Sequence, residues 1–320
     1  MEREGIAVVG TCIVDKIKEI DSYPAEGELT KIRSTTLAPG GLVPNDGVDI
    51  KRMCPHLPVY AVGKVGADPE GKFLTEFLRA NGLDTTHMVV SADGTTDFTD
   101  VMSVRGGQRT FFTSPGVGTT FGFADLNWDT LPCKLLHLGY FLLLDQVDQG
   151  DGLRILQEAQ KRGIRTSIDL VSESSDRYKL VRPCLPYTDN LIVNEIEGGR
   201  LCGMEPTEER LPEIARALKA LGVRERVILH TPKLGVCFDG ETLTELPSYV
   251  LPSGYIQGTT GAGDAYCAGA LIGIYEGRSD REILQMARVA ATASLGAPDA
   301  TSGMGSYEEM LELCKAFKEL

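Results

Sequence analysis

The sequence is short of histidine and tryptophan and has no closely spaced cysteine pair, and each shortage argues against a class of protein. Its 320 residues include four histidines and one tryptophan. The histidines, at positions 56, 87, 137 and 230, are too widely separated to suggest a metal site or a catalytic triad. The eight cysteines form no C-x-x-C pair, which favours reduced thiols in a cytoplasmic protein over a disulfide or zinc framework.

Positive charge and long apolar runs are also scarce. Lysine and arginine number 32 against 45 acidic residues, giving a net charge of −13. This balance argues against a nucleic-acid partner but not against ATP, because backbone amides and Mg²⁺ can supply a local positive field. No stretch approaches the length of a membrane span, and the apolar run near the N-terminus is too short for a signal peptide. We therefore expect no membrane partner.

The second half of the chain alternates between short apolar runs and helix-like patterns. Strands are predicted at Leu135–Leu138, Thr166–Leu170, Leu191–Val193 and Val227–His230. Strands that alternate with helices indicate a mainly parallel sheet, and such sheets bind ligands at the carboxyl ends of their strands. Asp169, Asn194 and Thr231 lie at or just after these strands, so we expect them to meet at one edge.

The first half contains strands that do not fit this sheet. After a buried strand at Ile6–Val9, residues 12–37 and 96–113 contain polar and apolar residues in alternation, and the second segment is split by Gly106-Gly107. We predict that the two segments form a separate, small β-sheet. A Gly66-to-Lys72 run imitates a phosphate loop, but Phe73 stands where Mg²⁺ binding needs Ser or Thr, and Asp68-Pro69 is typical of a helix start.

A glycine-rich turn at residues 258–264 leads into a helix pattern of small residues. Gly261 and Gly263 allow a tight turn and close approach of a ligand, and the free N–H groups at a helix start favour an anion. Asp264 is either an N-cap or a catalytic carboxylate, and the residues alone do not decide between the two.

The run GTTGAGDAYCAGA resembles the second signature of the ribokinase-like PfkB carbohydrate kinases. Other landmarks of that family occur in the same order along nearly the whole chain. They are Asp15, Gly40-Gly41 with Asn45, Asn194 with Glu197, and Thr231 with Gly235. The resemblance implies one domain over residues 1–320, with a three-layer α/β/α fold, a mainly parallel central sheet and a small β-sheet lid formed by about residues 12–37 and 96–113.

The resemblance also implies roles for individual residues. Asp264 would be the general base, and the amides of Gly261, Ala262 and Gly263 would form an anion hole for the transferred phosphate. Asp15, Gly40, Gly41 and Asn45 would bind sugar hydroxyls, with Phe98 and Phe111 as an apolar wall. Glu197, with Asp169, would organise Mg²⁺. ATP would contact Asn194, Thr231, Lys233, Gly235, Ala290, Ala293 and Gly303, and two copies would pair through the lid.

The implied reaction is ATP-dependent phosphorylation of a sugar or a sugar-like polyol. A nucleoside kinase of the same fold and a non-catalytic sugar- or nucleotide-sensing protein are the alternatives. A dinucleotide oxidoreductase is disfavoured, because no strand–G-x-G-x-x-G–helix unit occurs near the N-terminus. Many relatives carry an Asp at the place of Gly258 that helps to bind a monovalent cation, so dependence on K⁺ is doubtful here.

Overall fold

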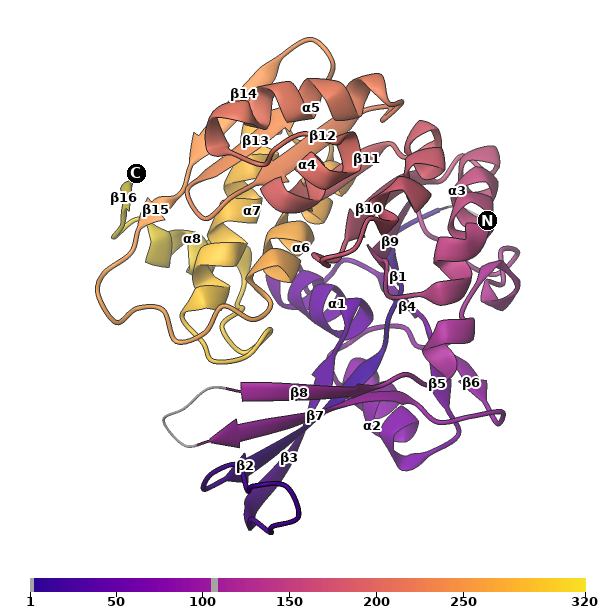
Figure 1. Cartoon of the computed structure of the whole chain (residues 1–320). Coiled ribbons are helices and arrows are strands. Elements are labelled where there is room, and N and C mark those ends of the chain that lie inside the picture. Colours follow the sequence, from indigo (N-terminus) through magenta and orange to yellow (C-terminus); the bar gives the residue numbers. More distant parts are fainter. Residues whose placement is uncertain (1–2, 105–108) are drawn as a thin grey trace.

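A central eight-stranded sheet organises the chain, which the computed structural model describes over residues 3–104 and 109–320 (Figure 1). Its order is β14-β13-β12-β11-β10-β9-β1-β4. All neighbours are parallel except β12–β13 and β13–β14, which are antiparallel. The strands are β1 (Ile6–Val9), β4 (Val59–Val62), β9 (Leu135–Phe141), β10 (Arg165–Leu170), β11 (Asn190–Asn194), β12 (Arg226–His230), β13 (Leu234–Phe238) and β14 (Leu243–Pro247).

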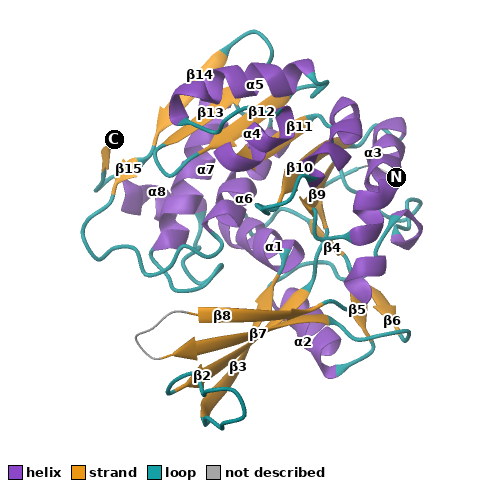
Figure 2. Cartoon of the chain, in the orientation of Figure 1, coloured by secondary structure: helices purple, strands orange, loops and turns teal. Residues whose placement is uncertain are grey.

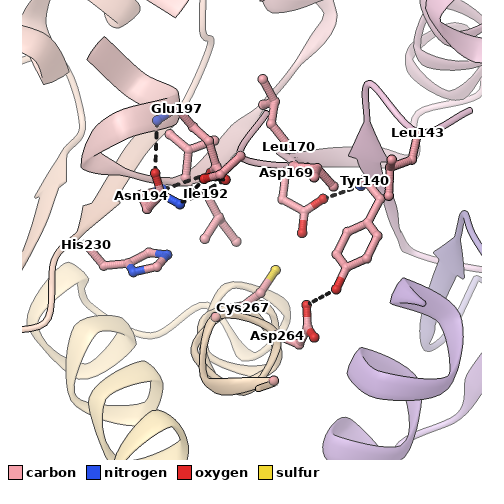
Figure 3. A pocket seen from close by; sticks show the side chains of 15 residues that line it. Tyr140, Leu143, Asp169, Leu170, Ile192, Asn194, Glu197, His230, Asp264 and Cys267 are labelled. Carbon is pink, nitrogen blue, oxygen red and sulfur yellow. Dashed lines mark hydrogen bonds between the residues drawn. The ribbon is translucent and has the colours of Figure 1, made fainter. Parts of the chain in front are cut away.

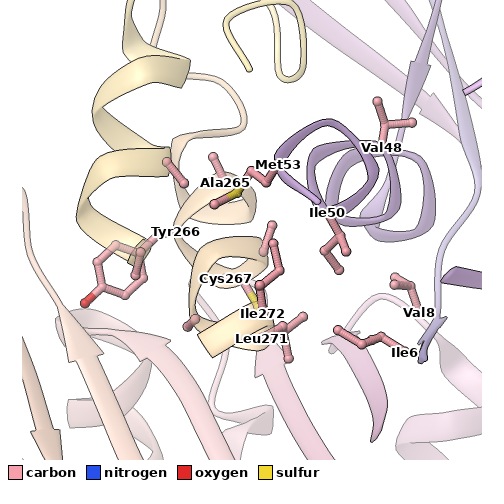
Figure 4. Packing of buried hydrophobic residues seen from close by; sticks show 14 of the residues in the cluster. Ile6, Val8, Val48, Ile50, Met53, Ala265, Tyr266, Cys267, Leu271 and Ile272 are labelled. Carbon is pink, nitrogen blue, oxygen red and sulfur yellow. The ribbon is translucent and has the colours of Figure 1, made fainter. Parts of the chain in front are cut away.

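Helices cover both faces of this sheet, which confirms the predicted three layers. Along β1, Ile6 and Val8 pack into one core and Ala7 and Val9 into the other, because successive side chains of a strand point to opposite faces. The first core is closed by α1 (Leu42–Met53), α6 (Ala262–Glu276) and α7 (Asp280–Leu295) (Figure 4). The second is closed by α3 (Gly152–Lys161), α4 (Glu195–Cys202) and α5 (Leu211–Ala220).

A separate four-stranded sheet projects from one side of the molecule, and we call it the lid (Figure 1). Its order is β3-β2-β7-β8, with β2 (Ile13–Ile20) and β7 (Asp97–Val104) parallel at the centre. The outer strands, β3 (Ile32–Gly40) and β8 (Arg109–Ser114), pair antiparallel with them. The predicted Gly106-Gly107 turn lies outside the described residues. β3 continues to Gly40, so the lid joins α1 with only Gly41 between them.

The remaining elements are short or peripheral (Figure 2). They are β5 (Lys64–Gly66) paired with β6 (Val89–Ser91), β15 (Tyr249–Val250) paired with β16 (Lys318–Glu319), α2 (Pro69–Ala80) and α8 (Tyr307–Cys314). Asp68 caps α2 by accepting a hydrogen bond from the Gly71 amide at 2.8 Å, so this run is a helix start and not a phosphate loop. All eight cysteines are free thiols. Within the described ranges, no helix combines the length and apolar character needed to cross a membrane.

Candidate active site

The glycine-rich turn enters α6 through a left-handed glycine. Gly261 is the N-cap with φ 81°, and a Cβ at this position would lie 2.4 Å from Cα and Cβ of Ala300. Only glycine satisfies both constraints without strain. Gly263, two residues later, has open space where a Cβ would be, so its backbone is accessible to a ligand.

Asp264 is the third residue of α6 and is not its cap. Its Oδ2 accepts a hydrogen bond from Asn45 Nδ2 at 2.8 Å, and its Oδ1 accepts one from the Tyr140 hydroxyl at 2.8 Å. Burial raises the pKa of Asp264 to about 6, while the Tyr140 hydrogen bond favours the ionised form. A carboxylate with a pKa close to physiological pH can accept a proton and release it again.

Tyr140 was not predicted as a site residue, and its backbone is unusual. Tyr140 and Leu142 have φ of 57° and 81°, a conformation that non-glycine residues seldom adopt. Asp148 holds this turn by accepting hydrogen bonds from the Leu142 amide and from Arg177 at 2.9 Å each. Strained backbone at the end of a strand is frequent at functional sites, and here it directs a phenol at Asp264 (Figure 3).

A cavity of about 280 Å³ lies at the carboxyl edge of the sheet, against the start of α6. Asp169 and Asn194, which were predicted to meet at this edge, line it together with Glu197, Gly263 and Asp264 (Figure 3). Its lining combines these polar residues with aliphatic side chains of β10 and β11, such as Leu170 and Ile192. Thr231, the third residue predicted there, lines a second cavity instead.

Glu197 lines this cavity and also closes the start of α4. Asn194 caps the helix, and the Glu197 carboxylate accepts hydrogen bonds from the Asn194 amide at 3.1 Å and from the Ser172 hydroxyl at 2.8 Å. Glu197 is therefore a helix-capping residue, and its position in the cavity also allows a functional role. Burial raises its pKa to about 7, so the carboxylate is poised for a neighbouring cation to hold it ionised.

A second, larger cavity of about 660 Å³ adjoins the first. Its lining includes β15, the loop after β12, and Ala291, Thr292 and Leu295 of α7. Asn194, His230 and Gly263 line both cavities. Burial lowers the pKa of His230 to about 4, so this side chain is neutral at physiological pH. The accessible backbone of Gly263 thus lies where the two cavities meet.

The predicted nucleotide residues fall into two groups. Asn194 and Thr231 line the second cavity. The other five lie outside its lining. Lys233 forms an ion pair with Glu208 at 3.6 Å, and Gly235 packs against the Tyr266 side chain. Ala290 and Ala293 are buried in the core, and Gly303 packs on Ala293. On α7 the predicted residues, Ala290 and Ala293, are not the ones that line the cavity. Ala291, Thr292 and Leu295 line it instead.

The predicted sugar residues lie at the root of the lid. A Cβ on Gly40 would be 3.1 Å from Asp15 Oδ2, so this glycine leaves the carboxylate uncovered. Gly41, with φ 87°, starts α1, and Asn45 one turn later contacts Asp264. Phe98 is half-buried beneath Lys16 Nζ at 4.0 Å.

The second predicted aromatic wall residue does not join this group in the structure. Phe111 is 62% exposed on β8. It lines neither the cavity at Asp264 nor the larger one beside it. A wall against a bound sugar would therefore need the lid to move.

Comparison with known proteins identifies the family. The model for the pfkB family of carbohydrate kinases matches residues 3–305. The chain belongs to this family. Its curated relatives include the ribokinase of Arabidopsis thaliana, 26% identical over 317 residues that cover 97% of this chain and 81% of the relative. The ribokinase of Bacillus subtilis is 25% identical over 317 residues, covering 96% and 98%.

The same fold is found in solved structures of this family. The structure of Arabidopsis thaliana ribokinase complexed with ribose and ATP has a TM-score of 0.84 and 24% identity, and covers 98% of this chain and 99% of that one. A nucleoside kinase of Methanocaldococcus jannaschii, an archaeal member of the ribokinase family, has a TM-score of 0.77 at 18% identity, covering 99% and 100%. These likenesses establish a ribokinase-like fold, and the family establishes a sugar kinase.

Proposed function

We propose that this protein transfers the γ-phosphoryl group of ATP to a hydroxyl group of a sugar or sugar-like polyol, with Asp264 as general base. The observation that carries the proposal is the position of Asp264 in the smaller cavity, beside the Gly263 backbone that both cavities share. An acceptor hydroxyl beside Asp264 and phosphates over Gly263 would be neighbours. Phosphoryl transfer depends chiefly on such positioning and on neutralising charge.

The proposed steps follow from the chemistry of these groups. Asp264 removes the proton from the acceptor hydroxyl as its oxygen attacks the γ-phosphorus in line, and the bond to the ADP oxygen breaks. The amides of Gly261, Ala262, Gly263 and Asp264 stabilise charge on the transferred group, as oxyanion-binding amides do. Asp15, Gly40, Gly41 and Asn45 hold the acceptor, and the lid excludes the water that would otherwise compete with it.

The larger cavity is the proposed nucleotide site. Its apolar lining from α7 suits a planar base, and Asn194 and Thr231 supply polar contacts. Two ribokinases with this fold have structures in complex with ATP or ADP, which supports a nucleotide as the ligand of this protein. Lys233 stays a proposed phosphate contact, although its ion pair with Glu208 would have to open.

The donor atoms around Glu197 fit the Mg²⁺ that the family implies. Glu197, Ser172 and Asp169 line the smaller cavity and carry carboxylate or hydroxyl oxygens, and Mg²⁺ prefers oxygen ligands with retained waters. The side-chain oxygen of Asn194 is occupied by the Glu197 amide, so Asn194 supports Glu197 instead. When bound, Mg²⁺ would neutralise charge on the phosphates. Glu197 would hold it from the rim of the cavity with Asp169 beside it, and the capping bonds of Glu197 keep that carboxylate in place.

The lid supports two further proposals, pairing of two copies and aromatic contact with the sugar. Ile32, Leu37, Phe111 and Phe112 are between 43% and 62% exposed on its strands. A small sheet with this much exposed apolar surface is suited to a second copy of the chain. We also propose a cytoplasmic location, consistent with eight free cysteines.

The variant Asp264→Asn tests the proposal. We expect loss of sugar-dependent ADP formation with ATP binding largely unchanged, measured by coupled ADP release and by calorimetry. Asp93→Asn, at an exposed loop position, is the matched control. If Asp264→Asn retains more than about a tenth of the turnover, Asp264 is not the base.

The same assay over sugars, polyols, sugar acids and nucleosides separates the alternatives. Turnover of adenosine, inosine or cytidine above that of every sugar would indicate a nucleoside kinase. Binding of ATP and sugar without ADP formation from any acceptor would indicate a sensing protein.

A further inference from the structure

Four buried side chains from four different elements converge behind Asp264. They are Asp46 on α1, His137 on β9, Asp169 on β10 and Cys267 on α6. One oxygen, nitrogen or sulfur atom from each lies within 4.8 Å of the others. Cys267 lies one helical turn after Asp264, so the cluster is directly beneath the proposed base.

The distances from His137 to the two carboxylates are too long for direct hydrogen bonds, whereas the distance between His137 and the Cys267 thiol is within the range of a hydrogen bond to sulfur. His137 Nε2 lies 3.6 Å from Asp46 Oδ2, 3.8 Å from Asp169 Oδ2 and 3.5 Å from Cys267 Sγ. A direct N–H···O bond spans about 2.7–3.2 Å. In a tetrahedral zinc site the bonds are about 2.0 Å to N or O and about 2.3 Å to S. Two N or O ligands are then about 3.3 Å apart, and an N and an S ligand about 3.5 Å apart. The three distances from His137 are close to these values.

Asp46 supplies an independent indication. Its side chain is fully buried, and no N–H or O–H group of the described residues donates a hydrogen bond to either carboxylate oxygen, which leaves the Cys267 thiol as its side-chain hydrogen-bond contact. A buried carboxylate without such a donor is strongly unfavourable, and coordination of a cation is one of the few arrangements that compensates it. No N–H or O–H donor therefore competes with a ligand for these oxygens.

The surroundings orient the other ligands toward the same point. His137 Nδ1 lies 3.1 Å from Ser167 Oγ, and a proton on Nδ1 donated to this hydroxyl leaves Nε2 with its lone pair facing the cluster. Asp169 Oδ1 accepts a hydrogen bond from the Tyr140 amide at 2.5 Å, which leaves Oδ2 for the cluster. Hydrogen bonds of this kind behind metal ligands are usual in metal sites.

We propose that Asp46, His137, Asp169 and Cys267 bind one zinc ion, separate from the Mg²⁺ of the phosphoryl transfer. A thiolate and an imidazole with two carboxylates form a soft-to-intermediate ligand set that selects Zn²⁺ over Mg²⁺. The ion ties α6, the helix that carries Asp264, to α1 and to β9 and β10. Asp169 offers Oδ2 to this ion and still lines the smaller cavity, where Glu197 is the residue proposed to hold Mg²⁺.

The test is metal content and ligand spectroscopy, which do not depend on catalysis. Tag-free protein, dialysed without chelator, is analysed by mass spectrometry for zinc, then stripped and titrated with Co²⁺. We expect about one zinc per chain, and tetrahedral visible bands with a thiolate-to-cobalt charge-transfer band in the ultraviolet. Cys267→Ser should remove that charge-transfer band and lower zinc affinity at least tenfold. Cys237→Ser, at a buried thiol on β13 outside the cluster, should retain both.

Two further variants keep the proposal open to refutation. Asp46→Asn should lower zinc content, and removing zinc with a chelator should lower Tm in the wild type but not in this variant. Glu197→Gln should keep zinc, which separates this site from the catalytic one. Folded wild-type protein with less than a tenth of an equivalent of zinc and no spectral response to Co²⁺ overturns the proposal. Zinc content unchanged in both Cys267→Ser and Asp46→Asn overturns it as well.

Discussion

The phenol of Tyr140 donates a hydrogen bond to the Asp264 carboxylate over 2.8 Å, linking the end of β9 to the start of α6. The two residues are 124 positions apart in the sequence, and burial raises the pKa of Tyr140, so its hydroxyl stays protonated and donates. The bond fixes the orientation of the proposed base and favours its ionised form.

Replacing Tyr140 by Phe should therefore shift the pH profile toward alkaline pH. Loss of the donated hydrogen bond raises the pKa of Asp264 above its value of about 6, so a smaller fraction is ionised near neutral pH. We expect the acid limb of the kcat/KM profile to move up by about one unit, with activity largely recovered above pH 8. Tyr60→Phe, on β4 away from the site, should leave the profile unchanged. An unshifted acid limb in Tyr140→Phe would contradict this role.

The proposed base should also lower the stability of the protein. The pKa of Asp264 is raised from 3.8 to about 6 in the folded state, so ionisation above that pH opposes folding. The difference corresponds to at most about 3 kcal/mol, lost again as the pH falls toward 4. Asp264→Asn should raise the free energy of unfolding at pH 8 by about 1–3 kcal/mol and by less at pH 5. Urea denaturation at the two pH values measures this, and an equal effect at both would contradict it.

Replacing each of the two glycines of the turn by alanine should change the stability of the protein in opposite directions. Gly261→Ala forces a left-handed φ on alanine and brings its Cβ to 2.4 Å from Ala300, so we expect destabilisation by about 1–3 kcal/mol together with loss of activity. Gly263→Ala meets no atom within 4 Å and lies inside the helix, where alanine is about 1 kcal/mol more favourable. Its stability should be kept or increased while kcat falls at least tenfold, because the methyl group occupies the phosphate position. Thermal unfolding and ADP release, measured together, separate the two effects.

Glu197 and Glu309 form a matched pair for testing the Mg²⁺ role. Each is the third residue of its helix and closes a capping box, Glu197 at α4 and Glu309 at α8. Glutamine can keep the cap in both helices but loses the charge. Glu197→Gln should raise the Mg²⁺ concentration needed for half-maximal ADP formation at least tenfold, and Glu309→Gln should not. Equal responses would mean that Glu197 acts only as a cap.

Potassium should have little effect on turnover. Gly258 provides no carboxylate, and a Cβ there would already lie 3.0 Å from the carbonyl oxygens of Ala297 and Pro298. Replacing a bulky inert cation by K⁺ at constant ionic strength should therefore leave kcat nearly unchanged. A several-fold rise would show that backbone carbonyls are sufficient to bind the ion.

Local sequence patterns predicted a helix best where its cap residues lie next to it in the sequence. The helix start predicted at Asp68-Pro69 matches α2, where Asp68 is the N-cap and Pro69 the first helical residue. The hairpin β13–β14 was missed, although Asp239-Gly240 between its strands is a common turn signal. Within that segment only Gly235 was assigned a role, as an ATP contact, and the expected alternation of strands and helices left no place for an antiparallel pair.

The site was harder to predict because its contacts are distant in the sequence. The four histidines are widely spaced, so no local spacing indicated a metal site, yet folding places His137 beside Asp46, Asp169 and Cys267. Asp46 looked like one more polar residue in a helix pattern. Its lack of an N–H or O–H donor becomes visible only when α1 packs against α6.

The single residue between the lid and α1 has a mechanical consequence. Thr11, just before β2, accepts hydrogen bonds from the Leu42 and Val43 amides, which hold the start of α1, so a tilt of β3 relative to α1 would change the backbone at Gly41. One turn further along the same helix, Asn45 holds Asp264. A change in the angle of the lid would therefore also change the orientation of the Asp264 carboxylate. An acceptor too small or too large to set the lid correctly would bind with its hydroxyl beside a misaligned carboxylate, so we expect discrimination among acceptors to appear in kcat more than in KM.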